Sequence, residues 1–226
     1  MPKPYKLILW DLDNTLFDFD KAEEAALQYA MRKHGLAYDP TTTLEAFRIV
    51  NLRRWEGLEQ KLYTKDEVLI GRFEEFFGAE NVDSSAFNAD YLWHLGENKA
   101  VYPEAESVVQ ALHSRGYIQS IVTNGAKEVQ DACFHHSPIA PFMKTVVISE
   151  EVGVAKPDPR IFEIACENSG WMDKASTLMV GDSLSSDIAG GKRYGVDTCY
   201  FNQSGKAHKA KPTYEICTLP EILTIL

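Results

Sequence analysis

The strongest constraint on the fold of this 226-residue chain is a regular alternation of apolar runs and amphipathic segments across residues 103–201. Apolar runs such as "YIQSIVT" at 117–123 alternate with helical patterns such as "EAESVVQALHSRG" at 104–116. Strand patterns that alternate with helices of this length predict βαβ units, and successive βαβ units build a parallel sheet. The sequence therefore predicts an α/β fold whose core is a doubly wound, Rossmann-like parallel sheet.

Another apolar run, "LILW" at 7–10, is separated from the others because only helical patterns lie between residues 20 and 100. This run has the length and composition of a buried central strand. Helix-start signals recur in the block that follows it, at Asp20, Thr42, Thr64 and Ser85. We therefore expect an all-helical cap, residues 18–99, inserted after the first strand of a core formed by 1–17 and 100–226.

The balance of charge excludes two classes of partner. The chain carries 23 basic and 33 acidic side chains, a formal net charge of −10. A field of this sign repels nucleic-acid polymers and anionic membranes, and no stretch reaches the roughly 20 apolar residues of a membrane span. Four scattered cysteines indicate reduced thiols, and the basic stretch 204–212 is most simply a solvated turn. We expect a cytoplasmic monomer or homodimer with no nucleic-acid or membrane partner.

Polar residues, with one glycine among them, follow the first four predicted strands. They are Asp11, Asp13, Thr123, Asn124, Gly125, Lys156, Asp182 and Asp187. The carboxyl ends of parallel strands meet at one edge of a sheet, so these residues are expected to lie together. Carboxylates without histidine or cysteine favour a hard cation such as Mg²⁺, while a lysine and a threonine hydroxyl suit phosphoryl oxygens. The set predicts a metal-assisted phosphoryl-transfer site.

Taken singly, each of these motifs has a plain structural explanation. Aspartates after a strand often cap a turn, "TNG" is typical of a turn, and "GDS" is typical of a helix start. A lysine before a proline is most simply a surface residue. Their order along the chain, each after a successive strand, favours the functional interpretation.

The motifs "DLDNT" at 11–15, "TNG" at 123–125, the lysine of "AKP" and "GDSLSSD" at 181–187 resemble the four signature motifs of the haloacid dehalogenase superfamily. The helical block after the first motif is similar to the cap of subclass I members. The resemblance covers nearly the whole chain. It implies an Mg²⁺-dependent hydrolase that acts on a small phosphorylated molecule.

The resemblance also implies a role for each residue. Asp11 would take the phosphoryl group as an aspartyl phosphate, and Asp13 would act as general acid and base. Thr123 and Lys156 would contact the transferring phosphoryl group. Asn124 and Gly125 would complete the phosphate-binding loop. The implied ligands of Mg²⁺ are Asp11, the backbone of Asp13, Asp182 and Asp187, the last directly or through water.

A narrower resemblance points to a substrate. Residues 146–162 and 178–188, with Asn51, Trp55 and Arg72 of the cap, resemble the bacterial pyrimidine 5′-nucleotidases. This implies hydrolysis of nucleoside monophosphates. Alternatives are a phosphatase or mutase for sugar phosphates or phosphoglycolate, and a catalytically silent binder of phosphorylated ligands. A 2-haloacid dehalogenase is disfavoured because a departing halide needs no proton donor such as Asp13.

The cap is the least explicit part of the sequence. Trp55 and the phenylalanines at 73, 76 and 77 could stack on a base, but at helical spacing they are more often core residues. Arg72 could meet a phosphate or pair on the surface with Glu75 or Glu59, and we favour the surface pair. The tentative substrate residues are Asn51, Trp55 and Arg72.

Overall fold

The computed structural model describes residues 5–98 and 100–226, without the side chain of Asn98. They form two compact units. The core unit contains the described residues up to 18 together with 100–127 and 134–226, and the helical unit contains those from 19 to 98 together with 128–133. The boundaries expected from the sequence, at 17/18 and 99/100, stay predictions, and residues 1–4 and 99 lie outside the described residues.

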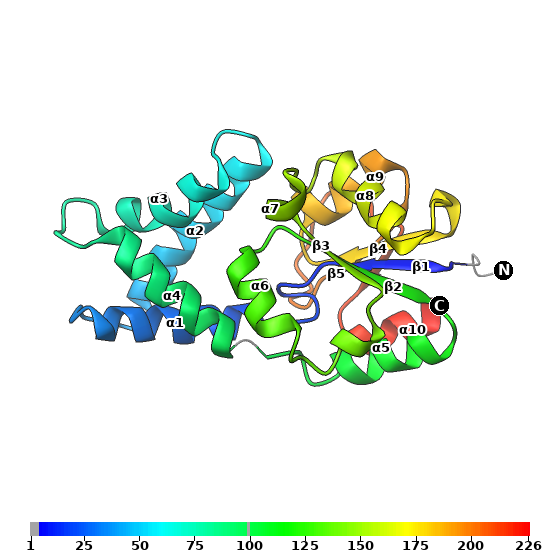
Figure 1. The fold of residues 1–226 in the computed structure, drawn as a ribbon, viewed down its shortest axis with the longest axis horizontal. Coiled ribbons are helices and arrows are strands. Elements are labelled where there is room, and N and C mark those ends of the chain that lie inside the picture. The colour runs from blue at the N-terminus through cyan, green and yellow to red at the C-terminus, as the bar shows by residue number, and fades with distance from the viewer. Residues whose placement is uncertain (1–4, 99) are drawn as a thin grey trace. The chain divides into compact units, whose positions relative to one another are not determined.

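The core unit is built on a six-stranded sheet in the order β3-β2-β1-β4-β5-β6, in which every neighbouring pair is parallel (Figure 1). The strands are β1 Leu7–Trp10, β2 Ile118–Thr123, β3 Thr145–Ile148, β4 Thr177–Gly181, β5 Asp197–Phe201 and β6 Tyr214–Ile216. This order confirms the predicted doubly wound sheet, with β1 at its centre. The sequence did not predict β6, whose three residues are too few to produce a strand pattern.

Helices and short turns lie between these strands along the chain or after the last of them. They are α5 Ala105–Ser114, α7 Ser149–Val152, α8 Pro159–Ser169, α9 Ala189–Tyr194, α10 Ile222–Ile225 and the 3₁₀ turns Ala140–Phe142, Lys174–Ser176 and Leu219–Glu221. Pro159 begins α8 and Asp158 caps it by accepting from Arg160 N at 3.1 Å. The segment from Leu184 to Tyr194 begins with a π turn, Leu184–Ile188, and continues as α9.

The helical unit contains α1 Phe19–Lys33, α2 Thr42–Glu59, α3 Lys65–Phe77 and α4 Ser84–Asn98. No strand occurs between residues 19 and 98 of the described chain, as the sequence predicts. Six residues of α6, Lys127–Phe134, also pack in this unit, where a Cβ on Gly96 would lie 3.0 Å from the Cβ of Ala132. Among the described residues, no helix has both the length and the apolar character to cross a membrane.

Backbone pairing within the core unit joins the two chain segments on either side of the cap insertion. The N–H of Asp18 donates to the oxygen of Ala100 at 2.9 Å, and the N–H of Tyr102 donates to the oxygen of Leu16 at 2.9 Å. Phe17 forms an isolated antiparallel bridge with Val101. We call these paired segments, residues 16–18 and 100–102, the neck. The insertion therefore begins and ends at neighbouring points of the core unit.

Candidate active site

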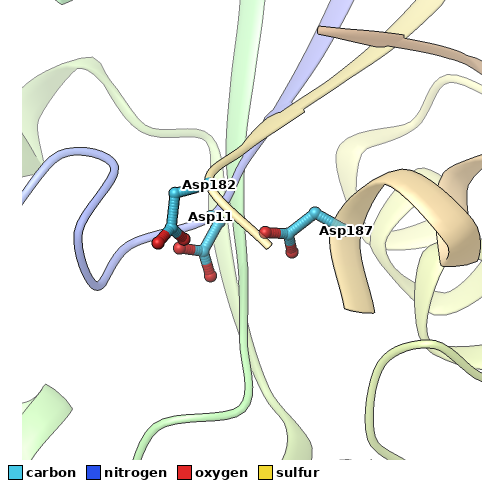
Figure 2. A group of neighbouring side chains, drawn as sticks. All are labelled: Asp11, Asp182 and Asp187. Atoms are coloured by element: carbon cyan, nitrogen blue, oxygen red, sulfur yellow. The ribbon is translucent and has the colours of Figure 1, made fainter. Parts of the chain in front are cut away.

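Three aspartates converge beside the carboxyl ends of β1 and β4 (Figure 2). Asp11 follows β1 directly, Asp182 follows β4 directly, and Asp187 lies in the π turn after it. One carboxylate oxygen from each residue lies within 4.8 Å of the other two. The structure thus brings together three acids that are up to 176 positions apart in the sequence (187 − 11).

Lys156 is the buried cation of this group. Its Nζ donates to Oδ1 of Asp11 at 2.5 Å and to Oδ1 of Asp187 at 2.7 Å, with 2% of the lysine exposed. A buried ammonium ion is costly unless it is paired and hydrogen-bonded, so the two carboxylates are what hold it there. The Oδ2 of Asp11 accepts no hydrogen bond from the described residues.

The loop after β2 is tied to the backbone of Lys156. The side-chain amide of Asn124 donates to the oxygen of Lys156 at 2.9 Å and accepts from its N–H at 2.8 Å. The N–H of Gly125 donates to Oγ1 of Thr123 at 3.0 Å. These bonds give the Asn124 side chain a structural role that the sequence analysis missed. Phosphate binding by Thr123, Asn124 and Gly125 stays a prediction.

Two further residues of the site were missed, although both belong to the "GDS" motif. A Cβ on Gly181 would lie 2.2 Å from Oδ2 of Asp187, so only glycine leaves room for that carboxylate. The N–H of Ser183 donates to the same oxygen at 3.0 Å. The sequence indicated Asp182 and Asp187 as the functional residues of this motif but not that its glycine and serine place Asp187.

Burial and the neighbouring charges shift the pKa values of the side chains in this site. Burial raises the pKa of Asp11 to about 7, since Lys156 offsets only part of this effect and the charges of Asp187 and Asp13 add to it. Loss of hydration, with the charge of Asp11, raises the pKa of Asp182 well above its ordinary value. Burial disfavours the charged form of Lys156, but the two adjacent carboxylates outweigh it and raise its pKa. Lys156 therefore stays protonated, whereas Asp11 and Asp182 hold their protons to higher pH than ordinary aspartates do.

A divalent cation fits this arrangement. The carboxylate of Asp182 accepts no hydrogen bond from the described part of the chain, so its oxygens are available as ligands. All donors in the group are oxygens, which is the ligand set that Mg²⁺ prefers. Both oxygens of Asp187 already accept hydrogen bonds, from Lys156 and from Ser183. Asp11 and Asp182 are therefore the better candidates for direct ligands.

Asp13 lies near the group without belonging to the three converging acids. Its negative charge contributes to the raised pKa of both Asp11 and Asp182. Asn14, which follows it, adopts a left-handed backbone with φ of 59°, a conformation that asparagine tolerates better than most residues. The acid–base role of Asp13 stays a prediction.

The three tentative substrate residues of the cap contact one another. Oδ1 of Asn51 accepts from Nε1 of Trp55 at 3.0 Å and from Nη1 of Arg72 at 3.2 Å. Oδ1 of Asn88 accepts from Nη2 of Arg72 at 2.9 Å, and Nδ2 of Asn51 donates to Glu23 at 2.9 Å. We call these five residues the cap network. Only Trp55 is partly exposed; the other four are buried.

Two expectations for the cap can now be compared with the structure. The surface position favoured for Arg72 is wrong, because only 2% of the residue is exposed and Glu75 pairs instead with Arg53 and Arg54. The preference for core positions among the phenylalanines is confirmed for Phe73 and Phe77, which are both buried. Phe73 lies 5.2 Å from Phe47, ring centre to ring centre, in a stacked arrangement.

Comparison with known proteins identifies the family. A family model described as haloacid dehalogenase-like hydrolase matches residues 5–195, which is most of the chain. The chain belongs to this family. The resemblance inferred from the four motifs is thereby confirmed, and so is the hydrolase class.

Two relatives of this haloacid dehalogenase-like hydrolase have the same named activity. The chain is 32% identical to the pyrimidine 5′-nucleotidase PynA of Streptococcus pneumoniae, over 98% of this chain and 95% of that protein. The chain is also 32% identical to the pyrimidine 5′-nucleotidase YjjG of Escherichia coli, over 97% of this chain and 96% of that protein. Among solved structures, the hydrolase YfnB of Bacillus subtilis, bound to magnesium, superposes with a TM-score of 0.91 at 30% identity and 99% coverage of both chains.

Proposed function

We propose that the chain is an Mg²⁺-dependent phosphomonoesterase whose preferred substrates are pyrimidine nucleoside monophosphates. The observation that carries the reaction class is the pairing of a buried lysine with Asp11, beside acids suited to a divalent cation. The choice of substrate is supported by the two pyrimidine 5′-nucleotidases at 32% identity over nearly the full length. The site has the parts needed to stabilise the negative charge of a phosphoryl group.

The reaction proceeds in two displacements at phosphorus. A carboxylate oxygen of Asp11 bonds to phosphorus while the bond to the leaving oxygen breaks, and Asp13 gives that oxygen a proton. A water molecule then attacks the same phosphorus, loses its proton to Asp13, and restores Asp11 as inorganic phosphate departs. Bound Mg²⁺, held by Asp11 and Asp182 with Asp187 and the backbone of Asp13 nearby, would supply charge stabilisation.

Lys156 and Thr123 prepare this reaction. Lys156 holds Oδ1 of Asp11, which leaves Oδ2 free to attack. Its positive charge favours the ionised form of the carboxylate, against the effect of burial, and offsets the charge of the phosphoryl oxygens. Thr123 lies at the end of β2, where its hydroxyl would donate to a phosphoryl oxygen, and Asn124 holds its loop against Lys156.

Within the cap network, Trp55 is the residue proposed to recognise the base. Its indole N–H is fixed by Asn51, which is itself held by Arg72 and Glu23. A partly exposed aromatic ring held in one orientation is suited to stacking on a planar base. Asn51 and Arg72 would act by positioning that ring.

The reaction class is tested by phosphate release from a substrate panel, with Mg²⁺ and with a chelator. The panel holds pyrimidine and purine monophosphates, sugar phosphates and phosphoglycolate. Mg²⁺-dependent release that is fastest from pyrimidine nucleotides supports the proposal in full. Preference for a sugar phosphate or phosphoglycolate would retain the mechanism and refute the substrate, and no release from any compound would refute both.

The role of Trp55 is tested by comparing two tryptophans of the helical unit. Trp55→Leu should raise KM for a nucleotide by roughly 5- to 100-fold, as expected from the loss of one base-stacking contact. It should leave hydrolysis of p-nitrophenyl phosphate, which has no base, unchanged. Trp93→Leu is the control, since Trp93 is 53% exposed and lies outside the cap network. Equal effects of the two variants, or equal effects on both substrates, would contradict the assignment.

A further inference from the structure

The loop between β5 and β6 carries lysines that the proposed reaction does not use. We define the basic strip as two exposed lysines of this loop, Lys206 and Lys209. Among the described residues, no acid forms an ion pair with either of them. The Nζ of Lys192 donates to the backbone oxygen of Lys211, which connects α9 to the loop.

The backbone of this loop is held in place from within. Asn202, which is 3% exposed, accepts from the N–H of Lys206 at 3.1 Å and donates to its oxygen at 3.0 Å. The same amide donates to Glu215 at 2.7 Å. Gly205 closes the turn with φ of +60°, a conformation that favours glycine. The solvated turn expected from the sequence is therefore an ordered loop with exposed lysine side chains.

A second anchor fixes the loop to the end of β5. Nε2 of His208 lies 3.1 Å from Oε2 of Glu215. The His208 ring meets the ring of Tyr200 edge-on, with 4.9 Å between ring centres and 82° between planes. Because Tyr200 belongs to β5 and Glu215 to β6, the basic strip keeps a fixed position on the sheet.

We call Asp11, Asp182 and Asp187 the acidic centre. The loop that carries the basic strip starts at the end of β5, one strand away from this centre. Tyr200 is opposite Gly181 in the register of β5 with β4, and Asp182 follows Gly181 directly. Neighbouring strands lie about 4.8 Å apart. Burial raises the pKa of Tyr200, and the negative charge of Asp182 raises it further. The electrostatic field of the acidic centre therefore extends to β5. Lys206, bonded to Asn202 just past the end of β5, lies at the same edge of the sheet.

The acidic centre needs such cations nearby. Three acids converge there, and the amine of Lys156 is already bonded to two of them. The whole chain carries a net charge of −10, so a phosphate dianion approaches a repulsive field. Lysines without an acidic partner, at the same edge of the sheet, would make the local electrostatic potential more positive and so attract the dianion.

We propose that the basic strip is an anion-capture surface that attracts phosphate monoesters to the centre and favours their binding there. This proposal rests on the proposed function, because it assumes that the bound molecule carries a phosphate group. It differs from the ordinary use of lysines beside an edge strand, which is to prevent pairing with another sheet. Edge protection alone would affect aggregation and leave phosphate affinity unchanged.

The test measures the dissociation constant of inorganic phosphate by calorimetry in the presence of Mg²⁺, so it needs no turnover. Lys206→Gln should weaken binding about 2- to 5-fold near 20 mM salt, and adding Lys209→Gln should weaken it further. At about 0.5 M salt the difference should vanish, because exposed charges are then screened. Lys144→Gln is the charge-matched control, an exposed lysine just before β3, at the opposite ends of the strands.

Equal weakening by Lys206→Gln and Lys144→Gln would overturn the proposal, because net charge alone would then explain the effect. So would a loss that persists at high salt, or aggregation of the strip variants with unchanged phosphate affinity. Phosphate binding that depends on the strip, in a protein that hydrolyses no phosphomonoester, would instead refute the proposed function and leave the capture surface intact.

Discussion

Asp11 is the residue on which both displacements depend, because its carboxylate forms and releases the phosphoenzyme. Asp11→Asn should lower turnover by at least about 10³-fold, since an amide oxygen is a poor nucleophile. Thermal unfolding should show an intact fold. Mass spectrometry must exclude deamidation back to aspartate, and Asp66→Asn, at an exposed position of α3, is the control. An active Asp11→Asn protein free of deamidation would disprove the covalent route.

Gly181 offers a steric test of the centre. The Cβ of Gly181→Ala would lie 2.2–2.7 Å from three side-chain atoms of Asp187, which would displace that carboxylate from Lys156. We expect weaker Mg²⁺ binding and strongly reduced turnover, measured by calorimetry and phosphate release. Gly191→Ala is the control, because its Cβ would meet Thr198 at 2.8 Å and disturb packing away from the carboxylates. Equal loss of Mg²⁺ affinity in both variants would contradict the steric explanation.

The sequence indicated the charged members of the centre but not the residues that hold them. Asp11, Asp182 and Lys156 could be grouped because strand ends of a parallel sheet converge. The Asn124–Lys156 amide bonds join two loops whose relative position no local pattern records. The restriction at Gly181 depends on a side chain six positions away in a turn whose π geometry the sequence did not predict.

Among the helices, Arg72 of α3 is the residue whose loss should cost most stability. Its guanidinium is buried, bonded to Asn51 and Asn88, and lies 4.8 Å from the centres of the Phe73 and Tyr91 rings. Arg72→Leu should lower the free energy of unfolding by about 2–4 kcal/mol, because the buried Oδ1 of Asn88 loses its donor and the Oδ1 of Asn51 loses one of its two donors. Arg72→Lys should also destabilise, since a single ammonium cannot reproduce the fork of donors.

Urea unfolding followed by circular dichroism measures this effect. Arg53→Leu is the matched control on the neighbouring helix α2, where the arginine side chain is 62% exposed, and should change stability by about 0.5 kcal/mol or less. A stable Arg72→Leu protein would show that the cap network does not support the helical unit.

The helices also show where local sequence signals are sufficient. Thr64 and Glu67 form the expected capping box at the start of α3, because both partners lie within one turn of the chain. The same spacing at Asp20 and Glu23 gave the wrong start for α1, which begins at Phe19. Glu23 is buried and accepts from Arg48 at 2.7 Å, a contact with α2 that the capping pattern does not record.

For the whole molecule, the raised pKa of Asp11 links stability to pH and to metal. Below pH 3.8 the carboxyl is protonated in both folded and unfolded chains, so its contribution to stability is fully present and does not change with pH. Between that value and about 7 the folded chain holds a proton that the unfolded chain has lost, so metal-free stability falls as pH rises. Mg²⁺ competes with this proton and should therefore stabilise the fold more at pH 8 than at pH 5.

Melting temperatures across this pH range, with a chelator and with Mg²⁺, measure both effects. The Asp11→Asn variant is the control, because its amide does not titrate and its metal-free melting temperature should fall less between pH 5 and pH 7. Parallel pH profiles in the two proteins would show that Asp11 does not carry the effect.

The neck gives the molecule a modular construction. Since residues 16–18 and 100–102 are bonded to each other inside the core unit, the helical insertion leaves and re-enters that unit at one place, whatever the length of the insertion. Asp11, Lys156, Asp182 and Asp187 all come from the core unit. Selection could therefore exchange or remodel the helices between the two neck segments while the chemistry stays unchanged, and one phosphoryl-transfer centre could serve many substrates.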